Sequence, residues 1–454
     1  MKTGLITRIR ARLGDFWWNA GIQFVASRSG DAINAFIGLW LVPRYVGASE
    51  LGAVLPLASF GVFLGMPISV FSTAFSKQVN VLAVRGEWGK LKTMLRGVFV
   101  AAFVFLVLAV VASRFLMPLV LERVRVAEGL LGVVILASAL SGSVAPIYTN
   151  TLRALKRFNT IAVIDIVSSP LRLVVMLAAM PLRALTGYFV GQTAAPTFQI
   201  CASVFAMRRE LGPSVKAEPC WDRRMVRTFG RYMGLLLVSS LAGAVVAFVE
   251  PLIIRQRLPE VDSAAYYFIS RFAEIGSYFG LSLTLVLFPY VSEESEKGGN
   301  GNRIVFRSMF GSLAFGVLCA LILAVLGRPV LSLLPGGASY VSYVPEMVAL
   351  TLIMALNMAV GCHIGGETAS NRFGWIWWSV PQSLVYCGVL LLLTGYGYLR
   401  GHVPDAWVDA IAGLDAARLD FILGLMALSA VSKAVCVAAV YLLRRRRDRK
   451  DGIE

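Results

Sequence analysis

Long apolar stretches recur along almost the whole chain and constrain its fold more than any other feature. A helix needs roughly 20 apolar residues to cross the hydrocarbon core of a bilayer, and about twelve such stretches follow one another with short connections. They are too long and too continuously apolar for barrel strands, so helices that satisfy their own backbone groups are expected. The predicted spans are Gly21–Arg44, Glu50–Ser76, Arg96–Leu116, Leu130–Asn150, Thr160–Met180, Ala184–Met207, Tyr232–Ile254, Ser263–Val291, Phe306–Leu326, Tyr343–Ile364, Gly374–Leu399 and Phe421–Leu443. The expected fold class is an all-α, polytopic membrane protein.

The distribution of charge agrees with this interpretation. Residues are 57% hydrophobic and only 15% charged, whereas soluble domains are about 45–50% apolar and about 25% charged. The net charge of +17 lies mostly in short loops, which argues for membrane topology and against a nucleic-acid partner. Alternate loops carry roughly three times as many Lys and Arg residues as the others, which predicts that both termini are cytoplasmic. We expect a multi-pass protein of the cell inner membrane whose basic loops contact anionic lipids.

The longest basic connection divides the predicted spans into two halves. We expect an N-terminal six-helix lobe at 1–207, a basic cytoplasmic linker at 208–231, and a C-terminal six-helix lobe with a basic tail at 232–454. Leu5, Ile9 and Leu13 recur every four residues before Trp17 and Trp18, which predicts an amphipathic helix on the membrane surface ahead of the first span. Internal repeats of six spans are common in transporters whose substrate site lies between the halves.

Ionisable residues occur inside the predicted spans, where a charge at the centre costs at least about 2.5–3.5 kcal/mol. The basic ones are Arg28, Arg172, Arg271 and Lys433, and nearby acids are Asp31, Asp165, Glu250 and Glu274. Helical spacing places several of them on shared faces: Arg28, Asp31 and Asn34; Asp165, Ser168 and Arg172; Tyr267, Arg271 and Glu274. Such polar stripes should face the bundle interior or a water-filled cavity.

Two interpretations of these stripes remain open. In the functional one, the arginines line a cationic cavity, because the planar guanidinium binds phosphate oxygens in two places and stays charged when partly desolvated. In the structural one, each arginine is neutralised by the acid on its own stripe and only joins helices. For Arg28 and Arg271 we favour the functional interpretation, with phosphate oxygens as ligands. Supporting or ion-coupling roles are expected for Asp31, Asn34, Glu274, Asp165, Arg172, Glu250 and Lys433.

Signatures of catalysis and of bound cofactors are missing from the sequence. It contains no GxxxxGK[ST] phosphate loop and no HExxH motif, and its six cysteines show no CxxC spacing. No outer loop is long enough for a catalytic domain. We therefore expect no enzymatic activity, no metal and no cofactor, apart from a coupling H⁺ or Na⁺ at Asp31 and Glu274.

Four segments resemble those of a known transporter family. Val42–Gly52 resembles the family's first outer loop, Thr151–Phe158 its fourth inner connection, and Ala265–Phe272 with Leu287–Ser292 its eighth span. On these segments the chain resembles the oligosaccharide and polysaccharide flippases of the multidrug/oligosaccharidyl-lipid/polysaccharide exporter superfamily. The resemblance implies a MATE-like fold of two six-helix lobes. It also implies export of undecaprenyl-pyrophosphate-linked oligosaccharide to the outer leaflet by alternating access.

The resemblance also bears on individual residues. Related lipid II flippases hold the pyrophosphate with arginines of the first and eighth spans, and Arg28 and Arg271 occupy comparable places. The chain differs from them in having no basic residue between Arg44 and Lys77. Lipid-linked oligosaccharide is the implied substrate, and other glycan-assembly membrane proteins are possible partners. The alternatives are a MATE-type multidrug or cation exporter and an integral-membrane glycan polymerase.

Overall fold

A computed structural model describes most of the chain. The described residues are 30–84, 86–126, 129–155, 157–208, 216, 218–219, 223–296, 302–370, 372–399 and 418–450. They are almost entirely helical and include no strand. Arg28 and the expected surface helix near the N-terminus lie outside the described residues, as do residues 209–215, 217 and 220–222 of the 208–231 linker, so these expectations stay predictions.

The chain divides into two compact units. One comprises Met1–Val46 and Leu57–Ala244, and the other comprises Gly47–Pro56 and Val245–Glu454. Two long helices, α3 (Ala48–Val84) and α8 (Arg223–Arg257), contribute residues to both units. The lobe boundaries expected from the sequence, with a linker at 208–231, stay a prediction.

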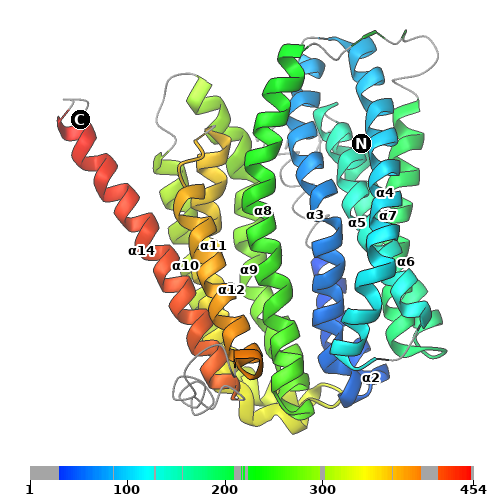
Figure 1. Cartoon of the computed structure of the whole chain (residues 1–454), viewed down its shortest axis with the longest axis vertical. Helices are drawn as coiled ribbons and strands as arrows, with labels where there is room; N and C mark the ends of the chain where they lie inside the picture. The colour runs from blue at the N-terminus through cyan, green and yellow to red at the C-terminus, as the bar shows by residue number, and fades with distance from the viewer. Residues whose placement is uncertain are drawn as a thin grey trace, which may run out of the picture. The chain divides into compact units, whose positions relative to one another are not determined.

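The first unit begins with helical residues 30–36, which continue into a π-helical segment and a short helix. These are η1 (Ile37–Leu41) and α2 (Val42–Tyr45). After α3 come α4 (Trp88–Val124), α5 (Gly129–Ala154), α6 (Phe158–Ala179) and α7 (Ala184–Arg208). Helix α7 packs closely along both α5 and α6, and Figure 1 shows these helices running side by side. Large apolar side chains such as Phe75, Leu91 and Ile147 are fully buried in the core of this unit.

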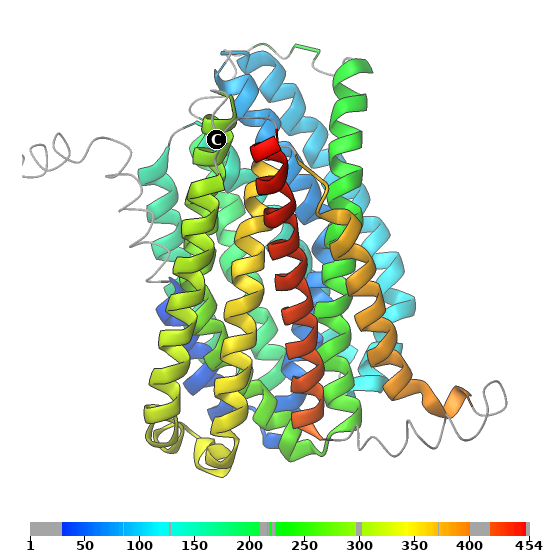
Figure 2. The same ribbon diagram turned by 90° about the vertical axis from the view of Figure 1, so that its left-hand side faces the viewer.

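The second unit is built around three helices that pack on one another. They are α9 (Glu260–Glu296), α10 (Asn302–Leu333) and α11 (Val344–Ala369), with the 3₁₀ segment η2 (Gly337–Tyr343) joining the last two. Helices α12 (Ile376–Leu399) and α14 (Leu419–Lys450) complete it. Helix α14 packs against α11 and α12, and Figure 2 shows α14 in red, with its C-terminal end continuing into the basic tail.

The predicted spans coincide with these helices. Every span predicted from Glu50–Ser76 onward falls on helical chain to within a few residues, and the first is helical over its described part. By length and composition, seven helical segments in the described part can cross a membrane. They are Ala48–Phe75, Leu130–Leu152, Asn159–Ala179, Phe229–Arg257, Asn302–Leu333, Gly337–Ala369 and Leu419–Leu442. The prediction of an all-α, polytopic membrane protein is confirmed.

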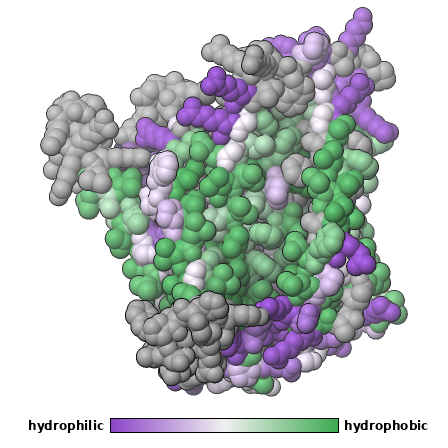
Figure 3. All heavy atoms as spheres, viewed as in Figure 1, coloured by the Kyte–Doolittle hydropathy of each residue, from purple (hydrophilic) through white to green (hydrophobic). Residues whose placement is uncertain are grey.

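The surface has the polarity that a bilayer requires. Many large apolar side chains are exposed along the middle of the helices, for example Val133 and Val174 in the first unit and Val325 and Leu428 in the second. On the face seen in Figure 3, apolar residues cover the middle of the helices and hydrophilic residues gather towards the helix ends. Water would penalise this exposure, whereas hydrocarbon does not.

Close packing of α7 against the end of α6 depends on Gly187. A Cβ atom at this position would lie 2.5 Å from the carbonyl carbon of Ala179 and 2.5 Å from the amide nitrogen of Met180. Because those are backbone atoms, we expect Gly187→Ala to destabilise the protein by about 1–3 kcal/mol. Thermal or chemical unfolding in detergent measures this. Gly243→Ala in α8 is the control, since a Cβ there meets nothing within 4 Å; equal stability of the two variants would contradict the prediction.

Candidate functional site

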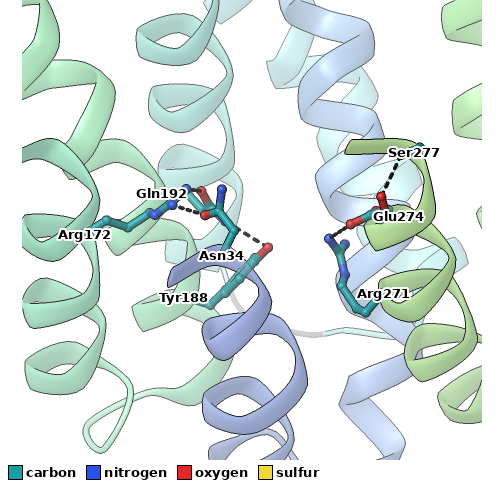
Figure 4. Close-up of polar contacts among 7 residues, drawn as sticks. All are labelled: Asn34, Arg172, Tyr188, Gln192, Arg271, Glu274 and Ser277. Atoms are coloured by element: carbon teal, nitrogen blue, oxygen red, sulfur yellow. Dashed lines mark hydrogen bonds and ion pairs between the residues drawn. The ribbon is translucent and has the colours of Figure 1, made fainter. Parts of the chain in front are cut away.

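In the first unit, Arg172 of α6 is held by two amide side chains from other helices. Its Nη2 donates a hydrogen bond to Asn34 Oδ1 of the first span, and its Nη1 donates to Gln192 Oε1 of α7 at 3.4 Å. Gln192 in turn donates from Nε2 to the Tyr188 hydroxyl at 3.0 Å. Figure 4 shows Arg172 extending from α6 towards Asn34 and Gln192. Amide oxygens fix the position of the guanidinium without adding a formal negative charge.

The backbone next to Asn34 is irregular. Three residues beyond it, the first span changes to the π-helical segment η1, whose turns are wider than those of an α-helix. Such π segments within helices are rare and occur frequently at functional sites. The segment packs Phe36 against Trp40, with ring centroids 5.1 Å apart, and Trp40 also stacks under the Arg44 guanidinium at 4.9 Å. These contacts stabilise the helix turn that follows Asn34.

A second polar contact joins α6 and α7 in the same unit. Gln199 Nε2 of α7 donates to Asp165 Oδ1 at 3.1 Å and to Ser168 Oγ at 3.3 Å. Ser168 also donates to the Asp165 carbonyl oxygen at 3.0 Å. The predicted stripe of Asp165, Ser168 and Arg172 therefore does form one face of α6, and that face lies against α7.

In the second unit, Arg271 and Glu274 form an ion pair on α9. Arg271 Nη1 lies 2.7 Å from Glu274 Oε2, and the guanidinium carbon lies 5.4 Å from the centre of the Tyr267 ring. Ser277 donates to the Glu274 carbonyl oxygen one turn further on. The two charged side chains keep 21% and 33% of their surface exposed, so both are accessible to a ligand. Figure 4 shows Arg271 turned along the helix towards Glu274.

Glu250 and Lys433 also belong to one polar cluster of the second unit. The Tyr386 hydroxyl of α12 donates to Glu250 Oε1 of α8 at 2.7 Å. Lys433 of α14 attracts the same carboxylate electrostatically. One turn from Tyr386, Gln382 Nε2 donates to the Ser429 carbonyl oxygen of α14 at 2.8 Å. The cluster therefore joins α8, α12 and α14 around the half-buried Glu250.

The structure thus brings together residues that sequence spacing had left on separate helices. Asn34 meets Arg172, and Glu250 shares its surroundings with Lys433. Asp31 is described in the first span, but its expected partner Arg28 lies outside the described residues. The binding and ion-coupling roles of all these residues stay predictions.

Neutral partners of the charged side chains were missed in the sequence. Tyr188, Gln192 and Gln199 follow one another at helical spacings of four and seven along α7, and Tyr386 lies in an apolar span. A search restricted to ionisable residues passes over them. Counting Gln and Tyr at helical spacing in spans would have found the α7 stripe, because it is the same periodic signal.

The chemistry that these clusters permit is binding of ions and polar groups. Among the described residues, no group of three or more His, Cys, Asp or Glu side chains could hold a metal ion. Guanidinium groups suit phosphate or carboxylate, and the half-buried carboxylate of Glu250 suits a proton or a monovalent cation.

Comparisons with known proteins identify the fold. The sequence matches no protein-family profile and no curated protein. Several solved structures align over nearly the whole chain, and three of them illustrate the range. The MATE transporter VcmN of Vibrio cholerae, in its bent form, is 16% identical over 98% of both chains, with a TM-score of 0.60. A MOP superfamily transporter from Pyrococcus furiosus, described with a binding pocket of reversed polarity, is 14% identical over 95% of both chains, with a TM-score of 0.57.

The third is a flippase. The lipid II flippase MurJ, in an inward closed conformation, is 13% identical over 93% of this chain and 92% of its own, with a TM-score of 0.53. Identities this low establish the fold and nothing further about chemistry. The apolar helices and the likeness to these structures show that the chain is a multi-pass membrane protein with a MATE-like fold, as in the MOP superfamily transporters compared above.

Proposed function

We propose that this protein is a flippase that moves undecaprenyl-pyrophosphate-linked oligosaccharide from the inner to the outer leaflet of the cytoplasmic membrane. The observation that carries the proposal is an arginine, fixed by polar neighbours, inside a predicted span of each unit. Charges at such positions are costly and need a function. A pyrophosphate headgroup is the membrane-borne ligand whose oxygens best match a guanidinium.

Each arginine is suited to phosphate in its own way. Arg172 is positioned by Asn34 and Gln192, so it loses little side-chain entropy when a ligand binds. Arg271 lies beside a tyrosine ring and a carboxylate that restrict its rotamers. The guanidinium carries five donors, so its Nη1 bond to Glu274 is compatible with a phosphate contact. The polyprenyl tail remains in hydrocarbon while the headgroup crosses.

Acidic residues supply a means of energy coupling. Glu274, Asp31 and Glu250 lie in predicted spans, and a proton or Na⁺ bound at one of them would be driven inwards as the headgroup moves outwards by alternating access. With the cytosol negative, the membrane potential contributes about 2.3 kcal/mol per charge per 100 mV to outward movement of an anion. The loop charges support cytoplasmic termini in this proposal.

The likeness to solved structures supports the proposal at the level of the fold. The MurJ structure is that of a flippase for a lipid-linked substrate. The Pyrococcus furiosus transporter is described with a binding pocket of reversed polarity that suggests a different function. A change in pocket polarity is therefore compatible with this fold, and the arginines of this chain favour an anionic ligand.

A multidrug exporter is the second candidate. The half-buried Glu250, held by Tyr386, is the observation that favours it, because a carboxylate in a spanning helix suits a cationic drug or a coupling cation. The likeness to VcmN, a MATE transporter, is compatible with this function too. A glycan polymerase is less favoured, since the chemistry of an enzyme is not needed to explain any of the clusters described.

One reconstitution experiment separates the candidates. The full-length protein in liposomes is supplied either with undecaprenyl-pyrophosphate oligosaccharide carrying a fluorescent sugar or with a fluorescent lipophilic cation. We expect protein-dependent exchange of the glycan lipid between leaflets, measured with a membrane-impermeant quencher, and no transport of the cation. Empty liposomes are the control. Proton- or Na⁺-driven transport of the cation, with no exchange of the glycan lipid, would reject the flippase in favour of the exporter.

A further inference from the structure

A cavity in the first unit lies at the opposite end of α6 from its turn into α7. It has a volume of about 560 Å³ and is bounded by the end of α5, the beginning of α6 and the end of α7. Arg157, Asn159 and Thr160 line one part of it, and Val163, Ile164 and Phe205 line another. The Arg172 contacts of the candidate site lie about two turns further along α6, so they are separate from this cavity, whereas Asp165 and its partner Gln199 adjoin it.

The polar part of the cavity favours an anion. Arg157 is exposed and directly precedes α6, which begins at Phe158. Its carbonyl oxygen accepts the Ile161 N–H at 3.2 Å, so the helix begins here, and the first N–H groups of a helix have no acceptor within it. The Asn159 amide and the Thr160 hydroxyl add neutral donors. A guanidinium, an amide, a hydroxyl and a helix N-terminus together match the oxygens of a phosphate group.

The apolar part of the cavity favours a hydrocarbon chain. Val163 and Phe205 are 61% and 64% exposed, and both lie in predicted spans, so their exposed surface faces the acyl region of the bilayer. Val163 belongs to a helical segment, Asn159–Ala179, that is long and apolar enough to span a membrane. The lining of the cavity thus changes from polar to apolar over about one turn of α6, which matches an amphiphile with a charged head.

We propose that this cavity binds an anionic phospholipid of the inner leaflet, with the phosphate at Arg157, Asn159 and Thr160 and an acyl chain along Val163 and Phe205. A free phosphate would leave the apolar wall without a partner, which is why the bilayer lipid is the occupant that fits. The site lies on the cytoplasmic side by the loop charges. It does not depend on which substrate the protein transports.

The test compares lipid retention by variants of the full-length protein. The protein is exchanged into nanodiscs of phosphatidylcholine with or without phosphatidylglycerol, and bound lipid is counted by native mass spectrometry after release into mild detergent. We expect the wild type to retain phosphatidylglycerol, and Arg157→Gln to weaken its apparent affinity about tenfold or more, as loss of a charged hydrogen bond predicts. Val163→Trp, which fills the apolar wall and leaves the charge, should weaken it too.

The matched control is Arg183→Gln. Arg183 is also an exposed arginine next to α6, but it lies at the other end of that helix, outside the cavity. Equal retention by Arg157→Gln and the wild type, or equal losses in Arg157→Gln and Arg183→Gln, would overturn the proposal. Inorganic phosphate serves as a separate arm. If it raises the melting temperature of the delipidated protein as much as phosphatidylglycerol does, the cavity is a phosphate site and the lipid assignment is wrong.

Discussion

Replacing Arg271 with alanine is expected to lower the rate of glycan-lipid translocation by about 10- to 100-fold. The guanidinium lies 2.7 Å from Glu274 and over the Tyr267 ring, so it is held in place and still partly accessible. A hydrogen bond to a charged group is worth about 1.5–3 kcal/mol, and each 1.4 kcal/mol corresponds to about a factor of ten in affinity. Arg271→Lys keeps the charge but loses the planar fork, and should retain an intermediate rate. Leaflet exchange of the fluorescent glycan lipid measures the effect.

Companion variants distinguish binding of the substrate from a purely structural ion pair within α9. A partly exposed ion pair is worth only about 0.2–1 kcal/mol, so Glu274→Gln should change unfolding stability little. If Arg271 binds the pyrophosphate, the affinity for glycan lipid falls much more in Arg271→Ala than in Glu274→Gln. Arg328→Ala, which removes an exposed arginine from α10, is the control. Full translocation by Arg271→Ala would reject the role assigned to this residue.

Replacing Arg172 with alanine is expected to impair both stability and transport, because this arginine joins three helices. Its loss leaves the amide oxygens of Asn34 and Gln192 without the donor that they accept from. Double-mutant cycles of interhelical hydrogen bonds in a membrane protein give about 0.6 kcal/mol on average and up to about 1.7 kcal/mol. We expect a coupling energy in this range between Arg172→Ala and Asn34→Ala, measured by chemical unfolding. Translocation should fall by about tenfold, which is the kinetic equivalent of about 1.4 kcal/mol.

Gln199→Ala provides the matched comparison for Arg172. Gln199 also links α7 to α6, but it bonds to Asp165 and Ser168. If joining helices is all that Arg172 does, Gln199→Ala and Arg172→Ala should reduce transport in proportion to their loss of stability. If Arg172 binds phosphate, Arg172→Ala loses more transport than its loss of stability accounts for. Arg172→Lys then retains part of the transport activity. A coupling energy near zero between Arg172→Ala and Asn34→Ala, together with wild-type transport, would show that the Asn34 contact matters for neither stability nor transport.

The positions of the helices followed from hydropathy alone. The hydrocarbon core accepts only segments that are apolar over a fixed length and that satisfy their own backbone groups. These two conditions leave little freedom, so each predicted span falls on helical chain to within a few residues where the structure describes it, although helices can run further: α4 and α8 begin eight and nine residues before their spans. The pairing of Arg271 with Glu274 could also be predicted from the sequence, since residues three apart on a helix are neighbours whatever surrounds them.

The contacts between helices required the folded chain. Asn34 and Arg172 lie 138 residues apart, and Glu250 and Tyr386 lie 136 apart. Their meeting depends on how each helix is rotated about its axis and on how closely backbones approach at positions such as Gly187. Hydropathy carries no information about that rotation, because lipid and a neighbouring apolar helix are almost equivalent solvents for an apolar side chain. The choice of partners is therefore made by side-chain packing and hydrogen bonding, which exist only once the helices have assembled.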